Sequence, residues 1–154
     1  MSLELVIDSS IFKSEADCIL IPVNKVGVMG AGIARQFKNK HPQGYKDYVA
    51  WCERGSPLPY LWENYGFFPT KKHWKDKSHY QQIKQDLLKF FALDDTIESI
   101  AIPPLGCGLG GLDPVTYIPK LVGDCYFLST IFHKHVEFYI TSQHRKEIHD
   151  SFQR

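Results

Sequence analysis

The sequence lacks closely spaced cysteine pairs and long apolar runs. Its four cysteines stand alone at positions 18, 52, 107 and 125, which excludes zinc ribbons and thioredoxin-type redox motifs, because both use CxxC pairs. The longest apolar runs, such as Cys18 to Val23, have about six residues, whereas a membrane-spanning helix needs roughly 20. No secretion signal opens the sequence, so we expect a cytoplasmic protein with reduced thiols and no membrane contact.

The sequence also lacks an excess of either charge, and it has no repeat or low-complexity tract. Lysine and arginine number 18 against 17 aspartates and glutamates, for a net charge of +1, which excludes a global polybasic field. Hydrophobic residues make up 44% and charged residues 23%, as in ordinary globular proteins. Since typical domains have roughly 150 residues, we expect one domain over residues 1–154, acting as a monomer.

Short runs rich in β-branched and aromatic residues predict strands. They cover Leu3 to Ile7, Cys18 to Val23, Tyr65 to Phe68, Ser99 to Pro103 and Val136 to Thr141. Apolar spacing and capping patterns between them predict helices over about 30–40, from Pro42 to Gly55, from a Ser78–Gln81 capping box, from Asp113-Pro114 and from about His144. This alternation favours an α/β fold with a mixed, mostly parallel sheet, whose ligands bind at the carboxyl ends of the strands.

Seven of the eleven glycines lie in two windows, residues 23–34 and 102–113, and each window follows a predicted strand and precedes a helix. Such loops turn backbone N–H groups outward, and the helix N-terminus behind them adds partial positive charge, so they can hold phosphate without a basic side chain. The alternative is that the glycines only make tight turns. Two such loops at matching positions favour an anionic ligand.

The second window contains Gly106-x-Gly108-x-x-Gly111, which matches the dinucleotide-binding fingerprint. That fingerprint usually follows the first strand, with an acidic residue at the tip of the next one. Here it follows a late strand, and Glu137 lies inside a predicted strand. A P-loop is excluded because no GxxxxGK[ST] occurs.

Three motifs together resemble the macrodomain family. Val-Asn-x-x-Gly-Val-Met-Gly-x-Gly-Ile-Ala at 23–34 and Ile-Pro-Pro-Leu-Gly-Cys-Gly-Leu-Gly-Gly-Leu-Asp at 102–113 are similar to its two ligand loops. Phe-Pro-Thr-Lys-Lys-His-Trp at 68–74 is similar to the DarG-like antitoxin macrodomains, which remove ADP-ribose from DNA bases. The resemblance implies a three-layer α/β/α sandwich with ADP-ribose as its ligand and with no cofactor or metal.

The resemblance also implies which residues bind. The second loop would hold the diphosphate through backbone N–H groups, and the first would enclose the distal ribose. The implied ADP-ribose contacts are Asn24, Gly27, Val28, Met29, Gly30, Ala31, Gly32, Ile33, Pro104, Gly106, Cys107, Gly108, Leu109, Gly110 and Gly111. On the adenine side they are Ser10, Ile11 and Ile140, with Asp8 and residues 139–141 as alternatives for holding adenine.

Asn24 and Lys71 are the implied catalytic residues. Asn24 would orient the distal ribose, since its amide both donates and accepts; alternatively, it caps the backbone of its own loop. Lys71 would act as base, nucleophile or electrostatic partner at the anomeric carbon. The alternative for Lys71 is a solvated lysine in a basic stretch.

Three positions depart from the family pattern. Ser10 stands where many macrodomains have an aspartate that binds the adenine amino group. Gly110 stands where relatives acting on acidic side chains have an aspartate paired with the lysine, so that pair is not available. Ile21 stands where the DarG-like pattern has a further asparagine.

The stretch from Lys71 to His79 has four lysines, two histidines and Trp74 against the single acid Asp76. An aromatic residue among cations is typical of single-stranded nucleic-acid binding, so we expect DNA contact through Lys71 to Lys77; a solvated loop is the alternative. Cys107 is interpreted as a packing residue. The spacing of His133-x-His135 suits one face of a strand, but without a third ligand it predicts no metal.

The sequence therefore predicts an ADP-ribosyl glycohydrolase that removes ADP-ribose from an acceptor, with DNA bases as the favoured acceptor. Two alternatives remain. One is a non-catalytic module that binds ADP-ribose or an ADP-ribosylated macromolecule. The other is a hydrolase of a small nucleotide such as ADP-ribose-1″-phosphate or O-acetyl-ADP-ribose.

Overall fold

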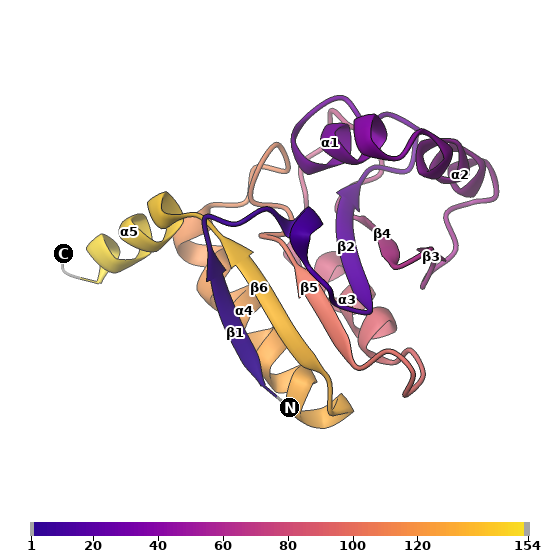
Figure 1. The fold of residues 1–154 in the computed structure, drawn as a ribbon. Helices are drawn as coiled ribbons and strands as arrows, with labels where there is room; N and C mark the ends of the chain where they lie inside the picture. Colours follow the sequence, from indigo (N-terminus) through magenta and orange to yellow (C-terminus); the bar gives the residue numbers. More distant parts are fainter. Residues whose placement is uncertain (1, 153–154) are drawn as a thin grey trace.

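A computed structural model of the chain describes residues 2–152 (Figure 1). Its elements alternate between strands and helices over most of the chain. In order they are β1 (Leu3–Ile7), the 3-10 turn η1 (Ile11–Lys13), β2 (Cys18–Val23), α1 (Gly32–Lys40), α2 (Pro42–Glu53), β3 (Leu61–Trp62), β4 (Tyr65–Pro69), α3 (Tyr80–Phe91), β5 (Ser99–Ile102), α4 (Pro114–Phe132), β6 (His135–Ile140) and α5 (Ser142–Ser151).

The strands form one sheet in the order β1-β6-β5-β2-β4-β3. Every neighbouring pair is parallel except β3 and β4, which are antiparallel. This confirms the predicted mixed, mostly parallel sheet. Because the five longer strands run the same way, their carboxyl ends meet at one edge, where ligands bind in such folds.

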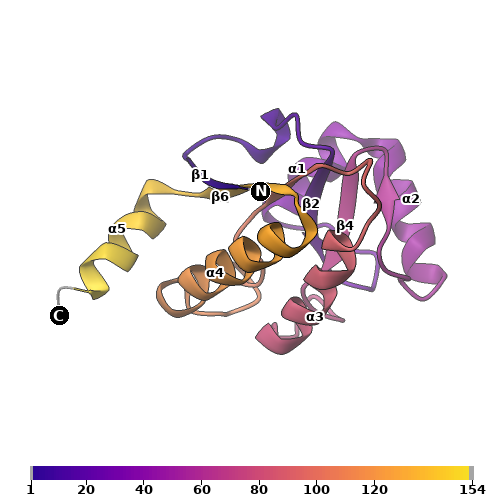
Figure 2. The same cartoon turned by 90° about the horizontal axis from the view of Figure 1, so that it is seen from below.

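The sheet is buried on both faces, as parallel sheets usually are. Consecutive side chains of a strand point to opposite faces, so Leu20 joins the cluster beneath α3 and α4, while Ile21 joins the one beneath α1 and α2. Phe68 and Phe67 of β4 divide in the same way. Figure 2 shows the resulting layers, with α3 and α4 on one side and α1 and α2 on the other, which confirms the three-layer sandwich.

Several local predictions need correction. The Ser78–Gln81 capping box is wrong: α3 begins at Tyr80 after His79, and the buried hydroxyl of Ser78 has no partner among residues 2–152. The last helix begins at Ser142 instead of His144, because the Thr141 side chain accepts from His144 N at 3.0 Å and caps it earlier. Two short elements, β3 and η1, showed no pattern in the sequence that could have predicted them.

The predicted N-cap of α4 is confirmed, because the Asp113 side chain accepts a hydrogen bond from Val115 N.

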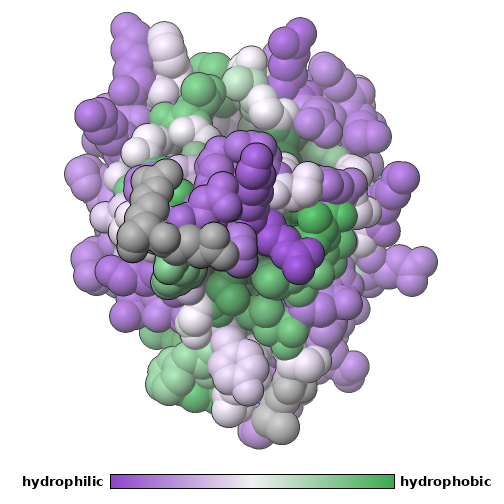
Figure 3. Space-filling view, turned by 90° about the vertical axis from the view of Figure 1, so that its left-hand side faces the viewer, coloured by the Kyte–Doolittle hydropathy of each residue, from purple (hydrophilic) through white to green (hydrophobic). Residues whose placement is uncertain are grey.

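Some apolar side chains remain exposed on the outer face of α4 and on the edge strand β1. They are Leu5, Tyr126, Phe127 and Ile131. Figure 3 shows one such face, on which apolar surface gathers below α5. Patches of this kind can serve as interfaces, so the expected monomer stays a prediction. Among the described helices, none combines the length and the apolar composition that crossing a bilayer requires.

Candidate functional site

Three loops meet at the carboxyl edge of the sheet, and hydrogen bonds join them. Beyond the strand ends, Thr70 N donates to Val23 O at 2.9 Å and Lys25 N donates to Lys72 O at 2.8 Å. Ser78 N donates to Gly110 O at 2.8 Å. The segment 70–79 is therefore tied to both glycine loops. Lys71, which is half-buried, lies within the part of this segment that is bonded to the first loop.

Asn24 fixes the shape of the first loop. Its Nδ2 donates to Val28 O at 2.7 Å, and its Oδ1 accepts from Val26 N at 3.0 Å and lies 2.7 Å from the Tyr48 hydroxyl. The side chain is only 7% exposed. Of the two interpretations of Asn24, the structure shows the loop cap; its contact with a ribose stays a prediction.

The rest of the first loop has one buried side chain and several exposed residues. Met29 is buried in the α1–α2 side of the core, so it can offer a ligand only its backbone. Val28 and Gly30 to Gly32 are exposed. Gly27 and Gly32 have φ angles of +82° and +57°, where a side chain is strained. The Tyr45 hydroxyl holds Gly27 O at 3.0 Å.

The second loop presents a run of backbone donors. Cys107 N is committed to Pro104 O and Gly111 N to Gly108 O. Within the part of the chain that the structure describes, no acceptor binds the N–H of Gly108, Leu109 or Gly110. Adjacent unpaired N–H groups are suited to an anion such as a diphosphate. The predicted phosphate loop thus has donors to offer at three of its central residues.

Gly110 is a glycine for a steric reason. A Cβ at this position would lie 2.2 Å from Ser78 Oγ and 2.7 Å from Gly106 O, far inside any real contact. An aspartate at this position is therefore excluded by its contacts with Ser78 Oγ and with the backbone of Gly106. The missing Lys–Asp pair follows from how closely the segment 70–79 packs against the second loop.

Cys107 is not poised for nucleophilic attack. Burial raises the pKa of its thiol to about 11, so the thiol is protonated at neutral pH, and it is the thiolate that attacks. Its Sγ lies 3.8 Å from Leu105 O. The packing interpretation of Cys107 is consistent with both observations.

A cavity of about 480 Å³ opens at the β1–β6 end of the same edge. It is lined by the predicted adenine-side residues Ser10, Ile11 and Ile140, together with Ile33 and Pro104. Aromatic rings from Phe12 and Tyr139 also line it, as do Gln36 and His144, and of these only Tyr139 had been considered from the sequence. Such flat, apolar walls suit a heterocyclic ring.

Asp8 supplies the acidic group of this cavity. The left-handed residue Asp8, at φ +56°, accepts from Ser142 N at 2.8 Å, and this bond lowers the pKa of its carboxyl. The Ser10 hydroxyl accepts from Phe12 N at 3.2 Å. Asp8 thus offers an ionised acceptor in the cavity where Ser10 replaces the family aspartate.

The order of these features follows the strand order. The cavity lies at β1 and β6, the N–H run follows β5, the Asn24 loop follows β2, and Lys71 follows β4. A ligand laid along this edge would place a ring in the cavity, an anionic centre over the second loop, and its far end beside Lys71.

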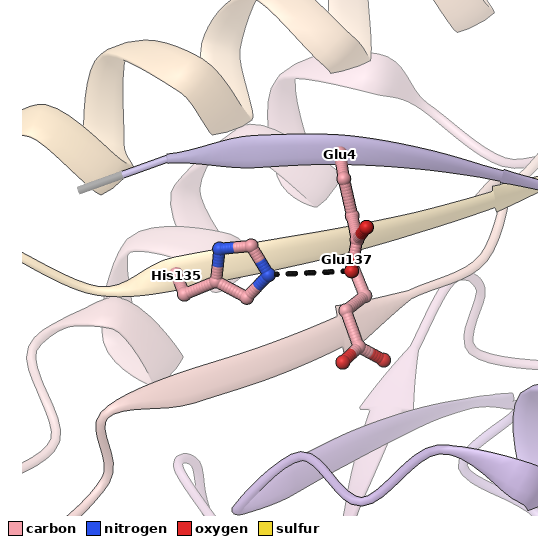
Figure 4. A group of neighbouring side chains, drawn as sticks. All are labelled: Glu4, His135 and Glu137. Carbon is pink, nitrogen blue, oxygen red and sulfur yellow. Dashed lines mark hydrogen bonds and ion pairs between the residues drawn. The ribbon is translucent and has the colours of Figure 1, made fainter.

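A separate cluster lies away from this edge. Glu4, His135 and Glu137 bring one ligand-type atom each within 4.8 Å of one another on the face of β1 and β6 (Figure 4). Glu137 Oε1 already accepts from Ser14 Oγ at 2.6 Å and from the Tyr139 hydroxyl at 3.0 Å. His133 is no part of it, because it is the left-handed C-cap of α4. The expectation that His133 and His135 share a strand face is wrong.

No protein-family model matches the chain. The sequence is 37% identical over 116 residues to a DNA ADP-ribosyl glycohydrolase of Thermus aquaticus, covering 67% of this chain and 32% of that protein. The chain spans about a third of the length of the curated relatives it matches. The macrodomain of Mycobacterium tuberculosis DarG is 30% identical with a TM-score of 0.71, over 88% of this chain and 97% of that one. This chain belongs to the DarG macrodomain family.

A further solved structure has a similar fold. Thermosipho africanus DarTG in complex with ADP-ribose is 29% identical with a TM-score of 0.77, over 92% of this chain and 42% of that one. The position of Ile21, where the DarG-like pattern has a further asparagine, can also be explained from the structure.

Ile21 is fully buried in the core beneath α1 and α2, so its side chain contributes packing here.

Proposed function

We propose that this DarG-like macrodomain removes ADP-ribose from DNA by hydrolysing the bond between C1″ of the distal ribose and a base. The observation that carries the proposal is the position of Lys71 directly after β4. The next residue, Lys72, accepts a backbone hydrogen bond from Lys25 of the first glycine loop, so Lys71 is held beside that loop. The names of the relatives as DNA ADP-ribosyl glycohydrolases support the reaction. The DarTG complex supports ADP-ribose as the ligand.

The site suggests a role for each part. Adenine would occupy the apolar cavity, and the diphosphate would accept from the N–H groups of Gly108 to Gly110. These donors need no rearrangement, which is what makes such sites effective. In hydrolysis, water oxygen bonds to C1″, the C1″–N bond breaks, and the base keeps the bonding electrons and takes a proton. The Lys71 ammonium would stabilise the charge on the leaving base. Alternatively, its neutral amine would bond to C1″ as the C1″–N bond to the base breaks, and water would then displace the lysine nitrogen from C1″.

The segment from Lys71 to Lys77 would contact the DNA strand. Trp74 is 48% exposed, and Lys75 Nζ lies 5.0 Å from the centre of its ring. An exposed indole beside cations suits a stacked base with a phosphate next to it. Since the protein as a whole is nearly neutral, this local charge would have to supply the attraction for the strand.

The direct test incubates the protein with single-stranded DNA carrying ADP-ribosylated thymine and follows free ADP-ribose. Lys71→Ala should lower the release rate at least a hundredfold, in the range of general acid–base contributions, while calorimetry shows ADP-ribose bound as before. Lys84→Ala is the matched control, because Lys84 is exposed on α3 and lines neither cavity.

A second candidate function is a module that binds ADP-ribose without cleaving it. The steric exclusion of an aspartate at Gly110 favours it, since one known pairing of the lysine is lost. Tight ADP-ribose binding with no release from any modified DNA would establish this candidate.

A further inference from the structure

A second cavity has Lys71 in its wall and is separate from the cavity at β1 and β6. It has a volume of about 610 Å³ and is formed by the end of β4, the segment after it, the first turns of α3 and Lys25 of the first glycine loop. Lys71 is part of its wall. Its volume is within the range of roughly 300–1,000 Å³ that is usual for small-molecule sites. A group released at Lys71 would therefore stand beside this cavity.

The cavity wall is cationic. It contains four lysines, at positions 25, 71, 72 and 77, and two aspartates, at positions 76 and 86, so its net charge of +2 exceeds that of the entire chain. Among residues 2–152 the ion pairs are Lys89–Asp86 and His135–Glu4, which leaves all four lysines unpaired. Clustered unpaired cations attract a polyanion.

Neither aspartate neutralises those lysines. Asp86 is 2% exposed and accepts from Gln82 Nε2 at 3.1 Å and from Lys89 Nζ at 3.3 Å. Asp76 Oδ2 accepts from His73 N at 3.0 Å. Both carboxylates are thus bonded to groups other than the four wall lysines, and the positive charge of these lysines is available to a ligand.

The same wall offers two amide groups that have no partner in the described chain. Gln81 and Gln85 are exposed and lie one turn apart on α3, so their side chains share a face. An amide donates and accepts at once, as the edge of a nucleobase does. Lysines for phosphate beside amides for a base edge match a nucleotide, which carries an anionic phosphate and a base edge in one unit.

We propose that this cavity binds the nucleotide adjacent to the modified one in a single DNA strand. The inference rests on the proposed glycohydrolase function and adds to it a subsite for the acceptor strand. The ADP-ribose would run along the strand ends to Lys71, and the DNA would continue from Lys71 over α3. The subsite makes the enzyme prefer a base within a strand to an isolated modified nucleoside.

The test compares two substrates: thymidine carrying ADP-ribose on its base, and a single-stranded oligonucleotide carrying the same modification on a central thymine. For Gln81→Ala/Gln85→Ala, we expect kcat/KM to fall about tenfold on the oligonucleotide and to stay unchanged on the nucleoside. Lys84→Ala, on the same helix but outside the cavity, should match the parent on both.

The outcomes separate the two proposals. If the double variant loses the same factor on both substrates, or on neither, the subsite is wrong while the glycohydrolase stands. If the parent releases ADP-ribose from an ADP-ribosylated acidic peptide and not from the oligonucleotide, the acceptor is a protein, and both the DNA subsite and the DNA glycohydrolase are wrong. If the parent cleaves none of these substrates although it binds ADP-ribose, both proposals fail.

Discussion

Replacing Asn24 by alanine tests what holds the first glycine loop in its conformation. The substitution removes the Nδ2 bond to Val28 O and the Oδ1 bond from Val26 N. A protein hydrogen bond contributes about 1 kcal/mol net, and a buried group left unpaired costs about 1–3 kcal/mol. We therefore expect Asn24→Ala to lower the free energy of unfolding by about 2–4 kcal/mol, which most domains of about 5–15 kcal/mol tolerate.

Urea denaturation measures this change, and calorimetry with ADP-ribose measures its consequence for binding. Asn39→Ala is the control, because Asn39 is an exposed residue of α1, and it should change stability by no more than about 0.5 kcal/mol. This expectation is wrong if Asn24→Ala unfolds at the same urea concentration as the parent protein and yet loses ADP-ribose affinity. Asn24 would then act by touching the ligand and not by holding its loop.

Three further predictions follow from the same loops. Gly110→Ala should force a Cβ against Ser78 Oγ and Gly106 O and displace the second loop, reducing ADP-ribose affinity at least tenfold by calorimetry; unchanged affinity would mean that the loop shifts without cost. Alkylation of Cys107 in the folded protein should be slow at pH 7 and rise toward pH 11, as expected of a thiol whose pKa is raised to about 11, whereas fast labelling at pH 7 would contradict the assigned burial. Release of ADP-ribose should be unaffected by EDTA, and loss of activity that is restored by added metal would overturn the metal-free assignment.

Much of the fold could be predicted because the signals were local. The strand Cys18–Val23 is a continuous apolar run, which reflects its burial on both faces, and Asp113-Pro114 marks the start of α4. The antiparallel strand Leu61–Trp62 was missed because two residues are too few to show a period. The Ser78 capping box failed because tertiary contacts fix that serine beneath Gly110.

The site was predictable at the level of loops but not of individual atoms. The glycine clusters located the two loops, and capping of the first loop was one of the two roles considered for Asn24, but only the structure shows which atoms its amide binds. The cavity at β1 and β6 joins residues 8–12 to residues 139–144, a contact that depends on the pairing of the first and last strands. The second cavity likewise joins Lys25 to α3 across β4. Such juxtapositions come from topology, which local patterns do not encode.

The central claim is that Lys71 cleaves the bond between ADP-ribose and a DNA base. A single-turnover experiment isolates this step, because protein at saturating excess over ADP-ribosylated oligonucleotide makes the observed rate independent of binding and of product release. We expect the first-order release rate of Lys71→Ala to be at least a hundredfold below that of the parent and of Lys84→Ala. Equal single-turnover rates for Lys71→Ala and the parent would contradict it.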